Sequence, residues 1–172
     1  MNFTIHQASA PVFVATLRNM SAWLDKAADR EAELLSARLA PDMHPLPAQY
    51  QMASDSAKNA MARLSGTEAP VMPDTEATFA ELKARCAATI AYVEGVDTAL
   101  LADAADRRVE MRFRNGMGYE FAGADYLTKF ALPNFMFHAT TAYAILRANG
   151  VPLGKPDFLA HLGQPNLGAA TT

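Results

Sequence analysis

The sequence predicts an all-α fold, a four-helix bundle with a small inserted β-hairpin. Four long segments carry apolar residues three and four positions apart, which is the spacing of one helix face. Prolines and glycines separate these segments, and one short stretch over 109–121 instead alternates apolar and charged residues. The length of 172 residues fits one domain, which we place at 1–162, followed by a flexible tail of small and polar residues at 163–172.

The first long helix is predicted to begin at Ser9 and Pro11, a capping hydroxyl followed by a proline in the first turn. Its inward face consists of Phe13, Leu17, Met20, Leu24 and Ala27. A shorter helix over 30–39 follows, with an apolar face of Leu34, Leu35 and Leu39. Three prolines over 41–47 then predict a loop, because proline disfavours helix at the residue before it.

Two further long helices follow this loop. One begins at Pro47, carries an alanine-rich inward stripe and ends at Gly66. The next is expected to be capped by Asp74 or Thr75 and to end at Gly95. Its stripe consists of Phe79, Leu82, Cys86, Ile90 and Val93, so we interpret the cysteine as a small buried hydrophobe and not as a reactive thiol.

The change of period after 108 predicts a β-hairpin with its turn at Asn115-Gly116. A loop of odd length gathers the apolar side chains on one face of the two strands, whereas a two-residue loop scatters them over both faces. We therefore expect the odd-length loop and the pairs Phe113 with Tyr119, Met111 with Phe121, and Arg112 with Glu120.

The last long helix is predicted to begin near 123–125 and to end at Asn149-Gly150. Pro133 interrupts it, because the ring lacks a backbone donor and presses on the carbonyl group of Lys129. We expect a kink at this point, or a break followed by a restart.

Composition excludes several classes of function. The net charge of −3 and the pI near 5.8 argue against a protein that binds nucleic acid. No apolar run is long enough to span a membrane, and the first residues lack the basic region of a secretory signal, so we expect a cytoplasmic protein. The single cysteine excludes a disulfide framework, and the four histidines are the complete supply of imidazole ligands.

Asn134 and His138 are the strongest candidates for chemistry, because their spacing of four residues places them on one helix face. Metal sites in helical bundles are built from such inward side chains. The alternative is a core histidine bonded to a carbonyl or carboxylate group, with Asn134 filling the backbone groups freed by Pro133. Asp55 would orient the imidazole if it lay beside His138. His44 and Asp42 share a rigid, proline-framed loop that can form the rim of a pocket.

Three segments together resemble a bacterial family of domains of unknown function within the DinB/YfiT-like superfamily of helical bundles. They are R-L-A-P-D-M at 38–43, A-S-D-S-A-K at 53–58, and the stretch over 130–147. The resemblance covers about 4–159 and implies a four-helix bundle and a homodimer.

The wider superfamily includes metal-dependent thiol transferases and a thiol-dependent isomerase. Their typical site takes one histidine from the second bundle helix and an H-x-x-x-H pair from the fourth. The resemblance places Asn134 and His138 at that pair, and it places Met52 near the remaining position, with Asp55 one turn further on. One of the three histidines is therefore in register, which implies a metal site that has been lost or rebuilt.

Three hypotheses follow. The first is a protein that binds a small molecule in a polar pocket between the second and fourth bundle helices, with pocket candidates His138, Asn134, Asp55, Tyr50 and Asp42. The second is a metal-dependent enzyme of the thiol-transferase type, with zinc or nickel in a rebuilt site of His138, Asp55 and His44. The third is a purely structural dimer. We rank the binding protein first, and the sequence assigns neither a catalytic residue nor a cofactor.

Overall fold

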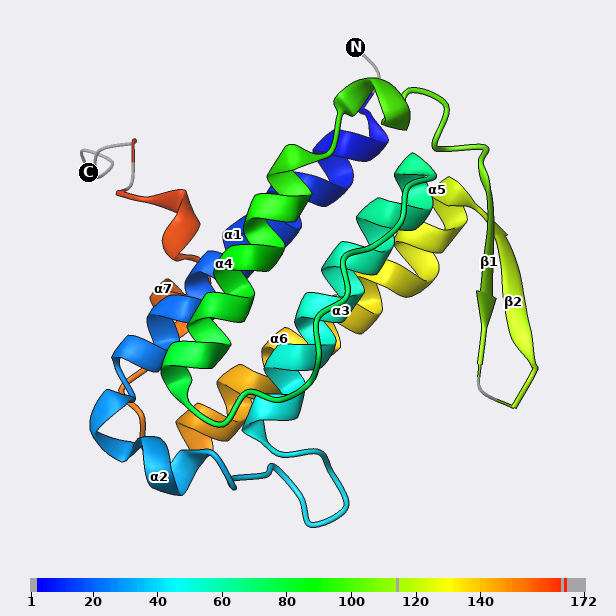
Figure 1. The fold of residues 1–172 in the computed structure, drawn as a ribbon. Helices are drawn as coiled ribbons and strands as arrows, with labels where there is room; N and C mark the ends of the chain where they lie inside the picture. The colour runs from blue at the N-terminus through cyan, green and yellow to red at the C-terminus, as the bar shows by residue number, and fades with distance from the viewer. Residues whose placement is uncertain (1–2, 114, 165, 167–172) are drawn as a thin grey trace, which may run out of the picture.

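A computed structural model of the chain describes residues 3–113, 115–164 and 166, and it confirms the predicted four-helix bundle with an inserted hairpin (Figure 1). The four long helices are α1 (Ile5–Asp25), α3 (Leu46–Ser65), α4 (Phe79–Gly95) and α6 (Leu132–Ala148). Residues 165 and 167–172 of the predicted flexible tail lie outside the described residues. No helix in the described ranges is long and apolar enough to cross a bilayer.

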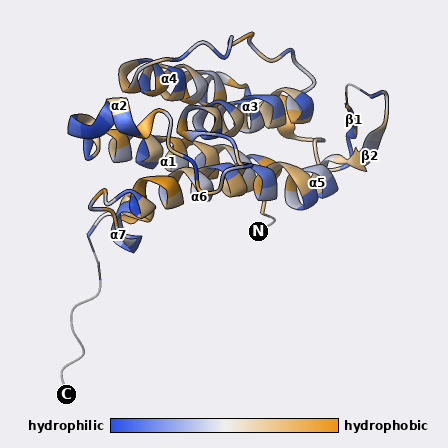
Figure 2. Ribbon diagram, turned by 90° about the horizontal axis from the view of Figure 1, so that it is seen from below, coloured by the Kyte–Doolittle hydropathy of each residue, from blue (hydrophilic) through white to orange (hydrophobic). Residues whose placement is uncertain are grey.

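The order of the helices around the bundle differs from their order in the chain. α1 packs between α4 and α6, and α3 also packs between these two helices. The connection over 66–78 returns along the length of the bundle, so that α3 and α4 run in the same direction (Figure 1). The hairpin and α5 (Gly123–Tyr126) lie at one end of the bundle, and α2 (Glu31–Leu34) lies at the other (Figure 2).

The core is formed by apolar side chains from all four helices. Phe13 of α1 meets Phe135 of α6 edge to face, with the ring centroids 4.9 Å apart. Trp23 stacks on Phe158 of the short helix α7 (Lys155–Phe158), which fixes the C-terminal segment against α1. The alanine-rich stripe of α3 is buried at Ala53, Ala57 and Ala60, as its composition predicts.

Two helix starts and one helix length differ from the prediction. α1 begins four residues before Ser9, because Thr4 and Gln7 form a reciprocal capping box. Pro11 therefore lies inside the helix. α4 is capped by Thr78, whose hydroxyl accepts from the amide of Glu81, and not by Asp74 or Thr75.

The predicted helix over 30–39 is reduced to the four residues of α2, which follow a 3₁₀ turn at Ala28–Arg30. Leu34 is fully buried, but Leu39 is 45% exposed and belongs to the loop. Because Leu34 is the one fully buried leucine of this segment, further helical turns would bury little additional apolar area. Pro41 also disfavours helix at the residue before it.

The hairpin confirms the odd-length loop, but the predicted pairs are wrong by two residues. The strands β1 (Arg108–Arg112) and β2 (Gly118–Ala122) pair Met111 with Tyr119, Val109 with Phe121 and Glu110 with Glu120. The amide of Phe113 donates to the carbonyl of Met117 at 2.7 Å, and this bond closes a three-residue loop in which Gly116 has a φ of 84°. A shift of two residues leaves each side chain on its predicted face, since strands repeat with period two. Arg108, rather than Arg112, therefore pairs with Glu120.

Pro133 produces a change of helix type instead of a break. α5 runs directly into a π-helical turn at Leu127–Ala131, and α6 begins at Leu132. The amide of Leu132 bonds to the carbonyl of Leu127, so the wider turn accommodates the proline that follows. The helix ends as predicted at Asn149, followed by Gly150 with a φ of 82°.

Candidate ligand pocket between α3 and α6

A pocket of about 320 Å³ lies between α3 and α6 and reaches the hairpin. Three of the predicted residues line it, namely Asp55, Asn134 and His138. The rest of the lining consists of Met52, Ser56, Asn59 and Arg63 from α3, Met111 from β1, and Tyr126, Phe130 and Ala131 from the segment before α6. The π-helical turn thus forms part of the wall, and such turns are frequent at functional sites.

His138 is held in one orientation. Its Nδ1 lies 2.9 Å from Oε1 of Gln49, and the residue is 8% exposed. The amide of Gln49 is itself fixed, because its Nε2 donates to the carbonyl oxygen of His44 at 3.1 Å. Gln49 therefore presents an acceptor to the imidazole, so that Nδ1 of His138 carries the proton and Nε2 keeps its lone pair.

Burial, with a smaller contribution from the nearby His44, lowers the pKa of His138 below its ordinary value of 6.5. The ring is therefore neutral at neutral pH. In the described part of the chain Nε2 has no hydrogen-bonding partner, and His138 belongs to the pocket lining. A neutral imidazole with one oriented N–H group and one free lone pair can accept a proton or a hydrogen bond from a ligand.

Asn134 connects the two walls of the pocket. Its Nδ2 donates to Oγ of Ser56 at 2.7 Å, and that hydroxyl donates to the carbonyl of Met52, also at 2.7 Å. The residue thus bridges α6 to α3 and does not fill the backbone groups around Pro133. Its carbonyl oxygen has no partner among the described residues.

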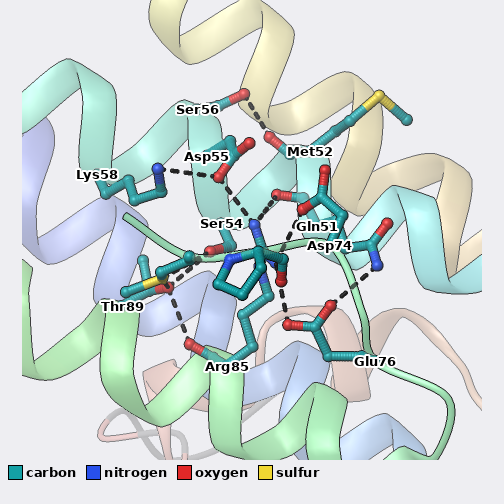
Figure 3. Close-up of polar contacts among 12 residues, drawn as sticks. Gln51, Met52, Ser54, Asp55, Ser56, Lys58, Asp74, Glu76, Arg85 and Thr89 are labelled. Carbon is teal, nitrogen blue, oxygen red and sulfur yellow. Dashed lines mark hydrogen bonds and ion pairs between the residues drawn. The ribbon is translucent and has the colours of Figure 1, made fainter. Parts of the chain in front are cut away.

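Asp55 is held by two cationic side chains and is not bonded to His138. Its Oδ1 accepts from Arg85 at 2.8 Å and lies 3.1 Å from Nζ of Lys58 (Figure 3). Arg85, whose side chain is 2% exposed, also contacts Asp74 at 2.9 Å and Glu76 at 3.0 Å. Asp55 therefore belongs to an ion-pair network, and the residue that orients the imidazole is Gln49.

This network joins three parts of the fold, since Asp55 lies on α3, Arg85 on α4, and Asp74 and Glu76 on the connection over 66–78 (Figure 3). Although burial disfavours the charge of Glu76, hydrogen bonds from Gln51 and Arg85 hold the pKa of its carboxyl group below the ordinary value.

Two of the predicted pocket residues lie elsewhere. Tyr50 is fully buried, and its hydroxyl donates to the carbonyl of Met20 at 2.8 Å, so it connects α3 to α1 in the core. Asp42 is exposed in the loop before α3 and does not line the pocket. Cys86 is buried as interpreted, and burial raises the pKa of its thiol to about 12.

The side chains that line this pocket do not fit the metal centre that the resemblance to the superfamily implies. Within the described ranges, no three or more His, Cys, Asp or Glu residues are grouped so that they could hold a metal ion. Asp55 is engaged by two cations, and Asn134 stands where a second histidine is needed. His138 alone retains a free ligating nitrogen at the position that the resemblance indicates.

The sequence did not predict roles for Gln49, Arg63 and Tyr126. The spacing along α3 could have predicted the position of Arg63. Positions 52, 56, 59 and 63 are four and three residues apart and so lie on one face of the helix, the face that lines the pocket. Gln49 carries no such signal, since its role depends on where α6 and the loop before α3 come to lie.

The four long helices run down, up, up and down (Figure 1), and comparison with a solved structure identifies this arrangement as a DinB-like helical bundle. A solved structure described as a DinB family member from Shewanella denitrificans, at 1.83 Å resolution, has a TM-score of 0.82 and 38% sequence identity to this chain. The match covers 96% of this chain and 95% of that one. The family model of the domain of unknown function DUF1993 matches residues 5–159, and the chain belongs to this family. A search of curated proteins found no match.

Proposed function

We propose that this protein binds a small molecule in the pocket between α3 and α6. The observation that carries the proposal is the buried imidazole of His138, which is fixed through Nδ1 by Gln49 and keeps Nε2 free at the pocket. A core histidine that served packing alone would gain stability by satisfying both nitrogens. The volume of about 320 Å³, together with convergent polar groups on mixed apolar walls, is typical of a small-molecule site.

The test is a thermal-shift screen of a library of small polar and amphiphilic compounds, carried out on the wild type and on His138→Gln. We expect compounds that raise the melting temperature of the wild type and raise that of the variant less. His6→Gln is the matched control, because His6 lies outside this pocket and lines a separate one at α1. A compound that binds there loses its effect in His6→Gln and keeps it in His138→Gln. If every stabilising compound acts equally on the wild type and His138→Gln, the pocket around His138 is not the binding site.

A metal-dependent enzyme of the thiol-transferase type is the alternative. One observation favours it, because histidines that bind metals commonly donate their second nitrogen to a carbonyl or carboxylate oxygen, as His138 does to Gln49. Elemental analysis of protein purified without a histidine tag distinguishes the two functions. Zinc or nickel near one equivalent per chain, lost in His138→Gln, would favour the enzyme, whereas the binding-protein proposal expects no stoichiometric metal.

A further inference from the structure

Arg63 gives the pocket one cationic end. The hydroxyl of Tyr126 accepts from Nη1 of Arg63 at 3.0 Å, and the guanidinium carbon lies 5.7 Å from the centre of the phenol ring. Asp55, the acidic residue of the lining, is engaged by Lys58 and Arg85. Among the described residues, no carboxylate pairs with Arg63.

The free edge of this guanidinium suits a planar anion. Because Tyr126 takes Nη1, the side formed by Nε and Nη2 is left without a partner among the described residues. Such an edge donates two parallel hydrogen bonds to the two oxygens of a carboxylate. Arg63 is the one cationic residue of the described lining, and one positive charge matches a carboxylate better than a doubly charged phosphate.

The distance between the polar ends indicates an elongated ligand. Arg63 lies in the last turns of α3, whereas Gln49, which holds His138, lies in its first turn. The residues of α3 that line the pocket run from Met52 to Arg63, which at 1.5 Å per residue corresponds to about 16 Å along the helix axis. Between the ends, Met111, Phe130 and Ala131 form an apolar strip of the lining. The polar side chains of Ser56 and Asn134 are bonded to each other, and Asp55 is paired with cations. Among the polar groups of this stretch, Asn59 therefore has no side-chain partner in the described part of the chain.

We infer that the pocket binds an elongated amphiphilic carboxylate, an inference that rests on the proposed function. Its carboxylate pairs with Nε and Nη2 of Arg63, its apolar chain lies against Met111 and Phe130, and its far end donates a hydrogen bond to Nε2 of His138. A hydroxyl, amine or thiol group at that end supplies the donor.

The probe is octanoate with a hydroxyl on its terminal carbon, compared by calorimetry with its methyl ester and with unsubstituted octanoate. In the wild type we expect the hydroxy acid to bind at least about tenfold more tightly than the ester, because the ester lacks the charge-assisted pair with Arg63. Arg63→Gln removes this preference for the acid, and Arg63→Lys retains part of it, since lysine keeps the charge without the planar edge.

Arg112→Gln is the matched control, because Arg112 is exposed on the hairpin and does not line the pocket. It keeps the full preference for the acid. His138→Gln keeps the preference for the carboxylate and loses the preference for the terminal hydroxyl. Circular dichroism and the melting temperature verify that each variant is folded.

Equal binding of the acid and the ester by the wild type, or an unchanged preference in Arg63→Gln, would overturn the inference. Either result leaves the proposed function standing, because that function is tested by the unbiased screen. No binding by any of the three probes would also overturn the inference as stated. A preference for the hydroxyl that survives in His138→Gln would overturn the contact with Nε2.

Discussion

The imidazole of His138 combines two properties at one buried site. One nitrogen is fixed by the chain from Gln49 to the carbonyl of His44, and the other remains available. An amide partner holds the ring without adding charge, in contrast to the carboxylate that Asp55 would have supplied if it lay beside His138. The ring therefore stays neutral and oriented, which suits hydrogen bonding to an uncharged donor better than binding of a proton.

The lowered pKa of His138 predicts a stability that depends on pH. As the pH falls, the unfolded chain takes up a proton near the ordinary value of 6.5, while the folded protein does so only at lower pH. The contribution of His138 to the free energy of unfolding is therefore complete above about pH 6.5 and is lost as the pH falls through the folded-state pKa.

Urea unfolding between about pH 7.5 and pH 5 measures this effect. We expect the loss of stability over that interval to be smaller in His138→Gln than in the wild type. His6→Gln serves as the control and should follow the wild type. A wild-type slope that persists in His138→Gln would show that another group titrates there.

At the scale of elements, the connection over 66–78 is fixed by ion pairs and by few apolar contacts. Asp74 and Glu76 meet Arg85 of α4, while Val71 is 94% exposed. Arg85 also holds Asp55, a residue of the pocket wall. The guanidinium group of Arg85 therefore pairs with this connection and with the pocket wall at the same time. A displacement of the connection would be expected to disturb the position of Asp55 in that wall.

Arg85→Met should lower the free energy of unfolding by about 3 kcal/mol, since removal of one member of a buried network leaves its partners uncompensated. We take the low end of the range because Asp55 and Asp74 keep part of their solvent contact. Urea unfolding measures the loss, and hydrogen exchange should show faster exchange over 66–78. Arg18→Met, which breaks an exposed pair with Glu94, should change stability by less than about 1 kcal/mol.

At the scale of the whole molecule, the sequence predicted the fold well because apolar periodicity is a property of each helix alone. The faces of α1, α3 and α4 follow from residues such as Phe13, Ala57 and Cys86, all of which are buried. The pocket was predicted in part, through Asn134, His138 and Asp55. Gln49 and Arg63 were missed because a partner on another helix gives each of them its role, and spacing within one helix carries no information about such partners.

The homodimer remains a prediction from the resemblance to the family. Light scattering coupled to size exclusion should give twice the chain mass of 18.5 kDa. Phe113 and Tyr119 are exposed aromatic side chains near the tip of the hairpin. Replacing both with serine in the same measurement tests whether they contribute to a dimer contact. A mass of one chain at concentrations up to the millimolar range would contradict the prediction.

The direction of the connection over 66–78 also affects how the chain folds. In a bundle with short turns, each helix folds back on the one before it, and two neighbours can form early. Here α3 and α4 are parallel, and the antiparallel neighbours are α1 with α4 and α3 with α6, which are far apart in the chain. Each of these pairs closes a long loop before it gains its contacts, so folding should be slower than in an up-down bundle of equal size.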